Sequence, residues 1–290
     1  MTLFDTVLCR LCLLLFAGFG LLASPASAQG TDSPARKPSH CLAVAQSAPG
    51  ITYLHKASFR DPVPQGRVRM QYVAHATFLI QTEGGTSAAT DFSGFLGSAD
   101  FLPDVVTMNK AHETHWTAFP DPAIPHVLPG WGPVDGEGIA HYLDLGDMVV
   151  RNVSTDLVSP YIGVREARGN SIFVFEAAGL CIGHLGHLHH TPTDEQFAAL
   201  GRVDVVMAPV DGGFTMPLDQ MIDILKRLRS SIVIPMHWFT DGGLRLFLTG
   251  MEDQFAVIET GLSSLTVSLE TLPAQPTVMV LRPEFLRDAD

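Results

Sequence analysis

The chain has 290 residues, of which 46% are hydrophobic and 17% are charged, so apolar material for a buried core is ample and nothing indicates disorder. The net charge is −12, from 18 basic and 30 acidic residues. This balance argues against a nucleic-acid partner, because phosphate binding needs clustered Lys and Arg. The length suits one large α/β domain or two small ones.

The first 28 residues have the pattern of a signal peptide. Arg10 precedes an apolar run over residues 11–23, and Ala26-Ser27-Ala28 supplies the small residues that signal peptidase requires. The run is shorter than the roughly 20 residues that span a bilayer, although a permanent anchor is the alternative interpretation. Cleavage after Ala28 would give a periplasmic or secreted protein with no stable membrane association.

Four cysteines occur, and two of them, Cys9 and Cys12, leave with the signal peptide. Cys41 and Cys181 remain in an oxidising compartment. They form one disulfide there, or they stay unpaired with one of them buried in a strand.

Residues 29–50 are rich in Pro, Ser and Ala, so we expect residues 29–67 to be a loosely held lead-in and residues 68–290 to form the domain. Apolar alternation and short apolar runs predict strands at 68–73, 77–82, up to Asp91, 105–108, 139–145, 148–153, 171–176, 180–183, 203–207 and 231–235. A strand pair is expected near 265–269 and 278–281. Residues 117–138 hold many Pro and Gly and predict a long loop.

Helices are predicted from Thr191-Pro192 to Gly201, over 218–229, and in the segment that follows up to Gly261. Strands therefore dominate the first half of the domain, and β-α-β alternation dominates the second. This order favours a single α/β domain with two sheets covered by helices.

The histidines are the residues that indicate the chemistry of this protein. All 12 lie after residue 28, and several directly follow an apolar strand. These are His112 and His115 after strand 105–108, His184, His187, His189 and His190 after strand 180–183, and His237 after strand 231–235. Such strands deliver side chains to one edge of a sheet. Imidazole is the commonest neutral ligand of zinc, and three or four hold one ion, so the pattern predicts a metal site.

The segments occur in an order that resembles the metallo-β-lactamase superfamily, in particular its UlaG-like branch. The matching segments are Val73-Ala74-His75-Ala76-Thr77-Phe78, Thr90-Asp91, Pro103-Asp104-Val105-Val106, Ile182-Gly183-His184-Leu185-Gly186-His187, the stretch 203–213, and Ile234-Pro235-Met236-His237. The resemblance covers about residues 68–240. It implies an αββα sandwich of two mixed β-sheets flanked by helices, and a metal-dependent hydrolase.

The chain departs from the family at its metal ligands. Where the family has His-x-His-x-Asp-His, this chain has Lys110-Ala111-His112-Glu113-Thr114-His115. His187 replaces the aspartate that bridges two metals, and no histidine occurs near Asp156, where the family has one. A two-metal site is therefore not expected.

The predicted site holds one divalent ion, zinc in the first place, with Fe, Ni or Cu as alternatives. Its predicted ligands are His112, His115, His187 and His237, with Asp156 as a substitute for the missing histidine. Three further residues are given catalytic or supporting roles. Lys110 or His184 would stabilise charge on the substrate, and Asp211, like Asp91, would orient a ligand imidazole. His75 either faces the site or forms a structural hydrogen bond.

Two functions fit the predicted one-metal site. The first is a hydrolase that acts on an ester, amide, lactone or phosphodiester bond of a small-molecule substrate. The second is a non-hydrolytic metal- or ligand-binding protein, because four imidazoles can close the coordination shell of one ion. The sequence carries no pattern that specifies an oligomeric state.

Overall fold

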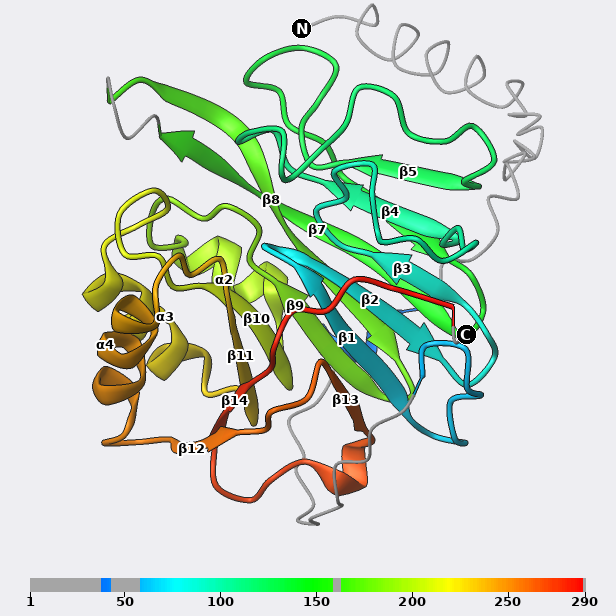
Figure 1. Cartoon of the computed structure of the whole chain (residues 1–290). Coiled ribbons are helices and arrows are strands. Elements are labelled where there is room, and N and C mark those ends of the chain that lie inside the picture. Colours follow the sequence, from blue (N-terminus) through cyan, green and yellow to red (C-terminus); the bar gives the residue numbers. More distant parts are fainter. Residues whose placement is uncertain (1–37, 43–57, 159–162, 289–290) are drawn as a thin grey trace, which may run out of the picture. The chain divides into compact units, whose positions relative to one another are not determined.

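Figure 1 shows the computed structural model, which describes residues 38–42, 58–158 and 163–288. The chain divides into two units, Met1–Arg36 and Lys37–Asp290, and all of the described residues lie in the second. The predicted signal peptide lies outside the described residues. Among the described helices, none has the length and apolar character needed to cross a bilayer.

Two mixed sheets form the centre of the domain (Figure 1). The smaller sheet has the order β13-β1-β2-β3-β4-β5. Its strands are β1 (Val68–Ala74), β2 (Thr77–Thr82), β3 (Ser87–Ala89), β4 (Val105–Met108), β5 (His126–Pro129) and β13 (Ser264–Val267). β3, β4 and β5 are parallel to one another, whereas the pairs β13–β1, β1–β2 and β2–β3 are antiparallel.

The larger sheet has the order β12-β14-β11-β10-β9-β8-β7-β6. Its strands are β6 (Tyr142–Asp144), β7 (Met148–Val158), β8 (Arg165–Ala177), β9 (Leu180–His184), β10 (Val205–Pro209), β11 (Ile232–Met236), β12 (Ala256–Glu259) and β14 (Thr277–Val280). The strands from β9 to β12 in this order are parallel, so their carboxyl ends share one edge of the sheet.

Alternation along the strands explains the layers. In β2, Phe78 and Ile80 face the core between the sheets, whereas Leu79 faces the outer side of the small sheet. β10 and β11 are buried on both faces, so they read as continuous apolar runs in the sequence.

Three helices cover the outer face of the large sheet (Figure 1): α2 (Asp194–Leu200), α3 (Leu218–Leu228) and α4 (Asp241–Met251). The 3₁₀ turns are η1 (His40–Leu42) and η2 (Leu269–Thr271). In the described residues, loops rather than helices pack on the outer face of the small sheet, through side chains such as Phe92, Leu96 and Ile124. The predicted two-sheet α/β fold is confirmed, with its helices gathered on the large sheet.

Several local predictions were wrong. β5 lies inside the segment predicted as a long loop. The first helix begins after Thr193, which forms a capping box with Gln196, and not after Thr191. α4 ends at Met251 and is followed by β12, so helix does not extend to Gly261. β13 and β14 are strands, but they belong to different sheets and do not pair with each other.

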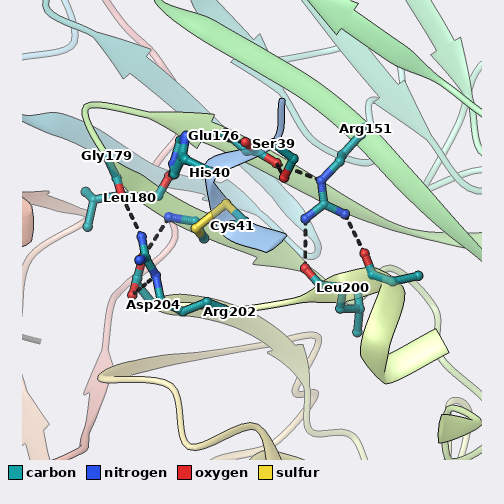
Figure 2. The surroundings of a disulfide bond; sticks show 12 residues. Ser39, His40, Cys41, Arg151, Glu176, Gly179, Leu180, Leu200, Arg202 and Asp204 are labelled. Atoms are coloured by element: carbon teal, nitrogen blue, oxygen red, sulfur yellow. Dashed lines mark hydrogen bonds and ion pairs between the residues drawn. A yellow bond between two sulfur atoms is a disulfide. The ribbon is translucent and has the colours of Figure 1, made fainter. Parts of the chain in front are cut away.

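Cys41 and Cys181 form a disulfide, with Cα atoms 5.8 Å apart (Figure 2). Cys181 lies in β9, and both cysteines are buried. Nearby, the buried Glu176 accepts hydrogen bonds from Ser39 Oγ at 2.5 Å and from Arg151 Nε at 2.7 Å. One described part of the predicted lead-in, residues 38–42, is therefore attached to the large sheet.

Candidate metal centre

Histidines from both sheets meet at one edge of the domain. His75 lies in the turn between β1 and β2, and His112 and His115 lie in the loop after β4. His187 follows β9, and His237 is the residue directly after β11. The edge formed by the carboxyl ends of the strands thus collects the side chains, as the strand-end pattern predicts.

Four of these histidines form a compact group: His75, His112, His115 and His237. One ring nitrogen from each lies within 4.8 Å of the others, which is a spacing that suits ligands of a single ion. His115 and His237 are fully buried, His75 is partly buried, and His112 is exposed. The group therefore opens to solvent on the side of His112.

Neighbouring side chains hold the Nδ1 atoms of three of these rings. Asp91 Oδ2 lies 2.5 Å from Nδ1 of His115, and Thr114 Oγ1 lies 2.8 Å from Nδ1 of His112. Asp211 Oδ1 lies 3.1 Å from Nδ1 of His237, although the N–H is poorly aligned for a hydrogen bond. A carboxylate on one ring nitrogen fixes the tautomer and leaves the other nitrogen to ligate, as in many metal sites.

Three Nε2 atoms of the group lack hydrogen-bond partners. Nε2 of His75, His115 and His237 is buried and makes no hydrogen bond in the structure. A buried polar atom without a partner costs about 1–3 kcal/mol, so three of them side by side call for a ligand that all three share. A metal ion fits this donor set, because neutral imidazole is a good ligand for zinc, iron, nickel and copper.

The electrostatics favour the neutral form of three of these imidazoles, those of His75, His115 and His112. Burial, together with repulsion by His237 and His112, lowers the pKa of His75 to about 3. Burial likewise lowers the pKa of His115 well below its usual value, and that of His112 to a lesser degree. Since a ligand histidine must be deprotonated, these three residues are ready to bind a cation at neutral pH.

The two supporting aspartates differ in their surroundings. Asp91 is fully buried, and this burial raises the pKa of its carboxyl group to about 6. Burial acts in the same sense on Asp211, but the adjacent His237 ring and the hydrogen bonds from the Thr215 hydroxyl and amide outweigh it and lower the pKa of Asp211. Asp211 also accepts the backbone N–H groups of Gly213 and Phe214, so it fixes the loop after β10.

His187, a predicted ligand, lies beside the four-histidine group. Its Nε2 is 3.2 Å from Nε2 of His112, and its Nδ1 is 2.7 Å from Nε2 of His189. Its ring centroid lies 4.9 Å from that of His115 and 5.0 Å from that of His237. The structure therefore brings the four predicted histidines together, and it adds His75 to them.

Two other predicted site residues, Lys110 and His184, have partners of their own. The Lys110 ammonium group contacts Asp135 at 2.9 Å and Glu166 at 2.8 Å, so carboxylates already neutralise it. His184 accepts the Gly186 N–H at Nδ1 and donates from Nε2 to the carbonyl oxygen of Ala76, so both of its ring nitrogens are used. Lys110 thus links side chains of three segments, and His184 joins backbone groups of two.

Asp156, the predicted substitute ligand, does not face the group. Its carboxylate pairs with the Arg165 side chain and accepts the Arg168 backbone N–H at 2.8 Å. It lies in β7 at an irregularity in the pairing with β8, between Thr155 and Leu157. His75 takes the place of the missing histidine. From the sequence, a structural hydrogen bond was an equally good interpretation of His75.

A cavity of about 530 Å³ adjoins the loop that carries His112 and His115. Its lining residues are Ser93, Glu113, Thr114, Trp116, Thr117, Ala118 and Phe119. Thr114 connects the cavity to the histidines, because its hydroxyl contacts His112. The volume lies within the range of small-molecule sites.

The two mixed sheets and the histidines at the strand ends together define an α/β fold with a candidate metal site. A family model described as the beta-lactamase superfamily domain matches residues 69–237, which is more than half of the chain. The chain therefore belongs to the β-lactamase superfamily, as the order of segments predicts.

Curated relatives match in shorter stretches. The UPF0173 protein of Pyrococcus abyssi is 32% identical over 62 residues, which cover 21% of this chain and 29% of that protein. A UPF0173 metal-dependent hydrolase of Thermoplasma volcanium is 32% identical over 72 residues, or 25% of this chain and 32% of that protein. The chain thus spans about a third or less of the length of these relatives.

Solved structures show the same fold. A Thermotoga maritima protein assigned to the Zn-dependent hydrolases of the metallo-β-lactamase superfamily has a TM-score of 0.53 at 22% identity, covering 74% of this chain and 98% of that one. A Parabacteroides distasonis protein assigned as a metal-dependent hydrolase has a TM-score of 0.50 at 15% identity, covering 69% and 95%. At these identities the likeness concerns the fold.

Proposed function

We propose that this protein is an exported metal-dependent hydrolase with a divalent ion, zinc in the first place, held by histidines alone. The observation that carries this proposal is the meeting of three buried, unpartnered Nε2 atoms with the exposed ring of His112. Membership of the β-lactamase superfamily supports it, and so does the likeness to the metal-dependent hydrolase of Thermoplasma volcanium.

The chain supplies the setting for hydrolysis of an ester, amide, lactone or phosphodiester bond. A divalent ion bound by His75, His112, His115 and His237 would polarise a substrate oxygen and lower the pKa of a coordinated water. Asp91 and Asp211 hold two of the rings in position. His112 leaves the group open toward solvent, and the adjacent cavity has room for a small-molecule substrate.

A specific observation also favours a second function. Four imidazoles within 4.8 Å of one another can complete a tetrahedral shell, and a closed shell is structural. In that case the protein binds a metal or ligand without hydrolysis. The exposure of His112 and the adjoining cavity favour the hydrolase, because a structural site has no need of access.

The experiment is metal reconstitution followed by an activity screen. Purified full chain is loaded with Zn, Fe, Ni or Cu, quantified by mass spectrometry, and assayed with chromogenic esters, lactones and phosphodiesters with and without chelator. Turnover that chelator abolishes supports the hydrolase. Bound metal without turnover across the series supports the second function, and a His112→Ala/His237→Ala variant that keeps its metal content overturns the site.

Export is supported by the signal-like first 28 residues and by the Cys41–Cys181 disulfide, since such bonds persist in oxidising compartments. Expression of the full chain followed by fractionation and N-terminal sequencing tests this. A mature protein that begins at Gln29 in the exported fraction is expected. A full-length chain that stays in the cytoplasm would contradict it.

A further inference from the structure

Two exposed phenylalanines lie beside the histidine group. The ring of Phe239 is 5.3 Å from that of His237 and 5.7 Å from that of His75, measured between centroids. Phe214 lies 5.3 Å from Phe239 in an edge-on arrangement. The two residues are 46% and 59% exposed, for Phe214 and Phe239 respectively. Phenylalanine is usually buried, and a contiguous exposed apolar patch marks a binding surface.

The elements that hold the histidines also hold these rings in place. Phe239 comes two residues after His237, and Thr240 caps the helix α4 that follows. The backbone N–H of Phe214 donates to Asp211 Oδ2 at 2.5 Å, and the same carboxylate faces His237. The pair therefore has a fixed position relative to the histidines, which a binding surface for one part of a substrate requires.

The lysine in the loop that carries His112 is not available to a charged substrate. Lys110, the cation in the His112 loop, is already bound by two carboxylates. Recognition of a phosphodiester usually relies on Arg or Lys side chains. Aromatic faces, in contrast, bind flat apolar groups in stacked or edge-on geometry with centroids 4.5–7 Å apart.

We infer that Phe214 and Phe239 bind a flat apolar group, an aromatic ring in the first place, attached next to the bond that is broken at the histidines. The substrate class is then an uncharged ester, amide or lactone with an aromatic substituent. This inference rests on the proposed metal-dependent function, since it places the reacting bond at His75 and His237.

Binding of two hydroxamates to the zinc-loaded full chain tests the inference without any turnover. Acetohydroxamate and benzohydroxamate present the same metal-binding group and differ in the phenyl ring. We expect benzohydroxamate to bind wild type roughly tenfold more tightly in calorimetry, because the ring gains apolar and aromatic contact. In Phe214→Ala/Phe239→Ala this preference should fall below about twofold, while the affinity for acetohydroxamate stays unchanged.

The chain offers a matched control. Phe95 and Phe285 form another exposed pair, with centroids 5.4 Å apart and exposures of 56% and 43%. Phe95→Ala/Phe285→Ala should keep the wild-type preference, and thermal unfolding should show that both double variants are folded.

The outcomes separate the two claims. If acetohydroxamate binds wild type but the phenyl ring adds nothing, or if the preference survives in Phe214→Ala/Phe239→Ala, the aromatic surface is refuted and the metal site stands. If neither hydroxamate binds the zinc-treated protein, the metal-dependent function fails and the inference fails with it.

Discussion

The backbone N–H of His237 donates a hydrogen bond to the carbonyl oxygen of His75 at 3.0 Å, which joins the two sheets in the middle of the histidine group. Both residues have positive φ, 40° for His75 and 59° for His237. Residues other than glycine rarely adopt this region, and such strain gathers at functional sites. The positions of these two rings thus depend on a backbone arrangement that the surrounding contacts must maintain.

Tyr72 is one of these contacts, because its hydroxyl donates to the same His75 oxygen at 2.7 Å. Tyr72→Phe would remove this bond and keep the stacked contact with Phe78. We expect the free energy of unfolding to fall by about 1 kcal/mol in urea denaturation, since a buried hydrogen bond contributes about that much. Zinc affinity, measured by competition with a chromophoric chelator, should weaken as His75 becomes less fixed. Unchanged stability and affinity would show that the hydroxyl has no positioning role.

The Asp91–His115 pair is expected to control metal affinity. Asp91→Asn removes the carboxylate from Nδ1 of His115, and such changes typically weaken metal binding 10–100-fold. The same chelator competition measures the loss. Asp104→Asn serves as a control. Asp104 accepts hydrogen bonds from Ser87 and lies before β4, at the opposite end of that strand from the loop with His112 and His115. Equal affinities for the two variants would contradict the orienting role.

His75 and His187 are predicted to differ as ligands. His75 belongs to the group within 4.8 Å, whereas His187 lies outside that group and has its hydrogen-bond contact with His112. Metal content by mass spectrometry should therefore fall severalfold more in His75→Ala than in His187→Ala. His126→Ala is the control, because His126 lies in β5 outside the group, and it should retain full metal content. The reverse ranking of His75 and His187 would restore the ligand set expected from sequence.

The metal-free protein is expected to lose stability on acidification from pH 7 to 5. The pKa of His75 is lowered to about 3, and burial also lowers the pKa of His115 and His187 well below the usual value of about 6.5. Between these values the unfolded chain binds protons that the folded chain does not, so stability falls as pH falls through 6.5.

Asp91 acts in the opposite direction, because its raised pKa of about 6 lets the folded state bind one proton more than the unfolded state between about pH 4 and 6. One carboxyl group offsets only part of the effect of three imidazoles. The midpoint of thermal unfolding in chelator-containing buffer should therefore decrease between pH 7 and 5. A constant or rising midpoint would contradict the lowered histidine pKa values.

The disulfide is expected to contribute about 2–5 kcal/mol, because it joins residues 140 positions apart and restricts the unfolded chain. Cys41→Ala/Cys181→Ala should lower the urea midpoint accordingly, and reduction of wild type should have a similar effect. Glu176 and Arg151, which hold the adjoining backbone, remain in place in that variant. A midpoint equal to that of oxidised wild type would mean that this bridge adds little.

The sequence predicted most strands because β2, β4, β10 and β11 are apolar runs long enough to read locally. It missed β5, whose four residues include His126 and Pro129 in a Pro- and Gly-rich stretch, because only parallel pairing with β4 makes it a strand. The partners of β13 and β14 were also wrong, since pairing between distant segments leaves no local pattern.

The site shows the same division. His112, His115 and His237 follow strands, so their meeting could be expected from sequence. The inclusion of His75 depends on the positive φ at the β1–β2 turn and on its hydrogen bond to His237, neither of which a single sequence reveals. The contacts of Lys110 and Asp156 with distant charged groups were equally hidden.

The antiparallel pairing of Val68 in β1 with Val267 in β13 sets a boundary for engineering and synthesis of this domain. The family match stops at residue 237. Beyond it, β13 pairs with β1 in the small sheet, and β14 pairs with β11 in the large sheet. A fragment cut after the last histidine would expose two strand edges to self-association. During synthesis, nearly all of the chain must therefore leave the ribosome before β1 can pair with β13.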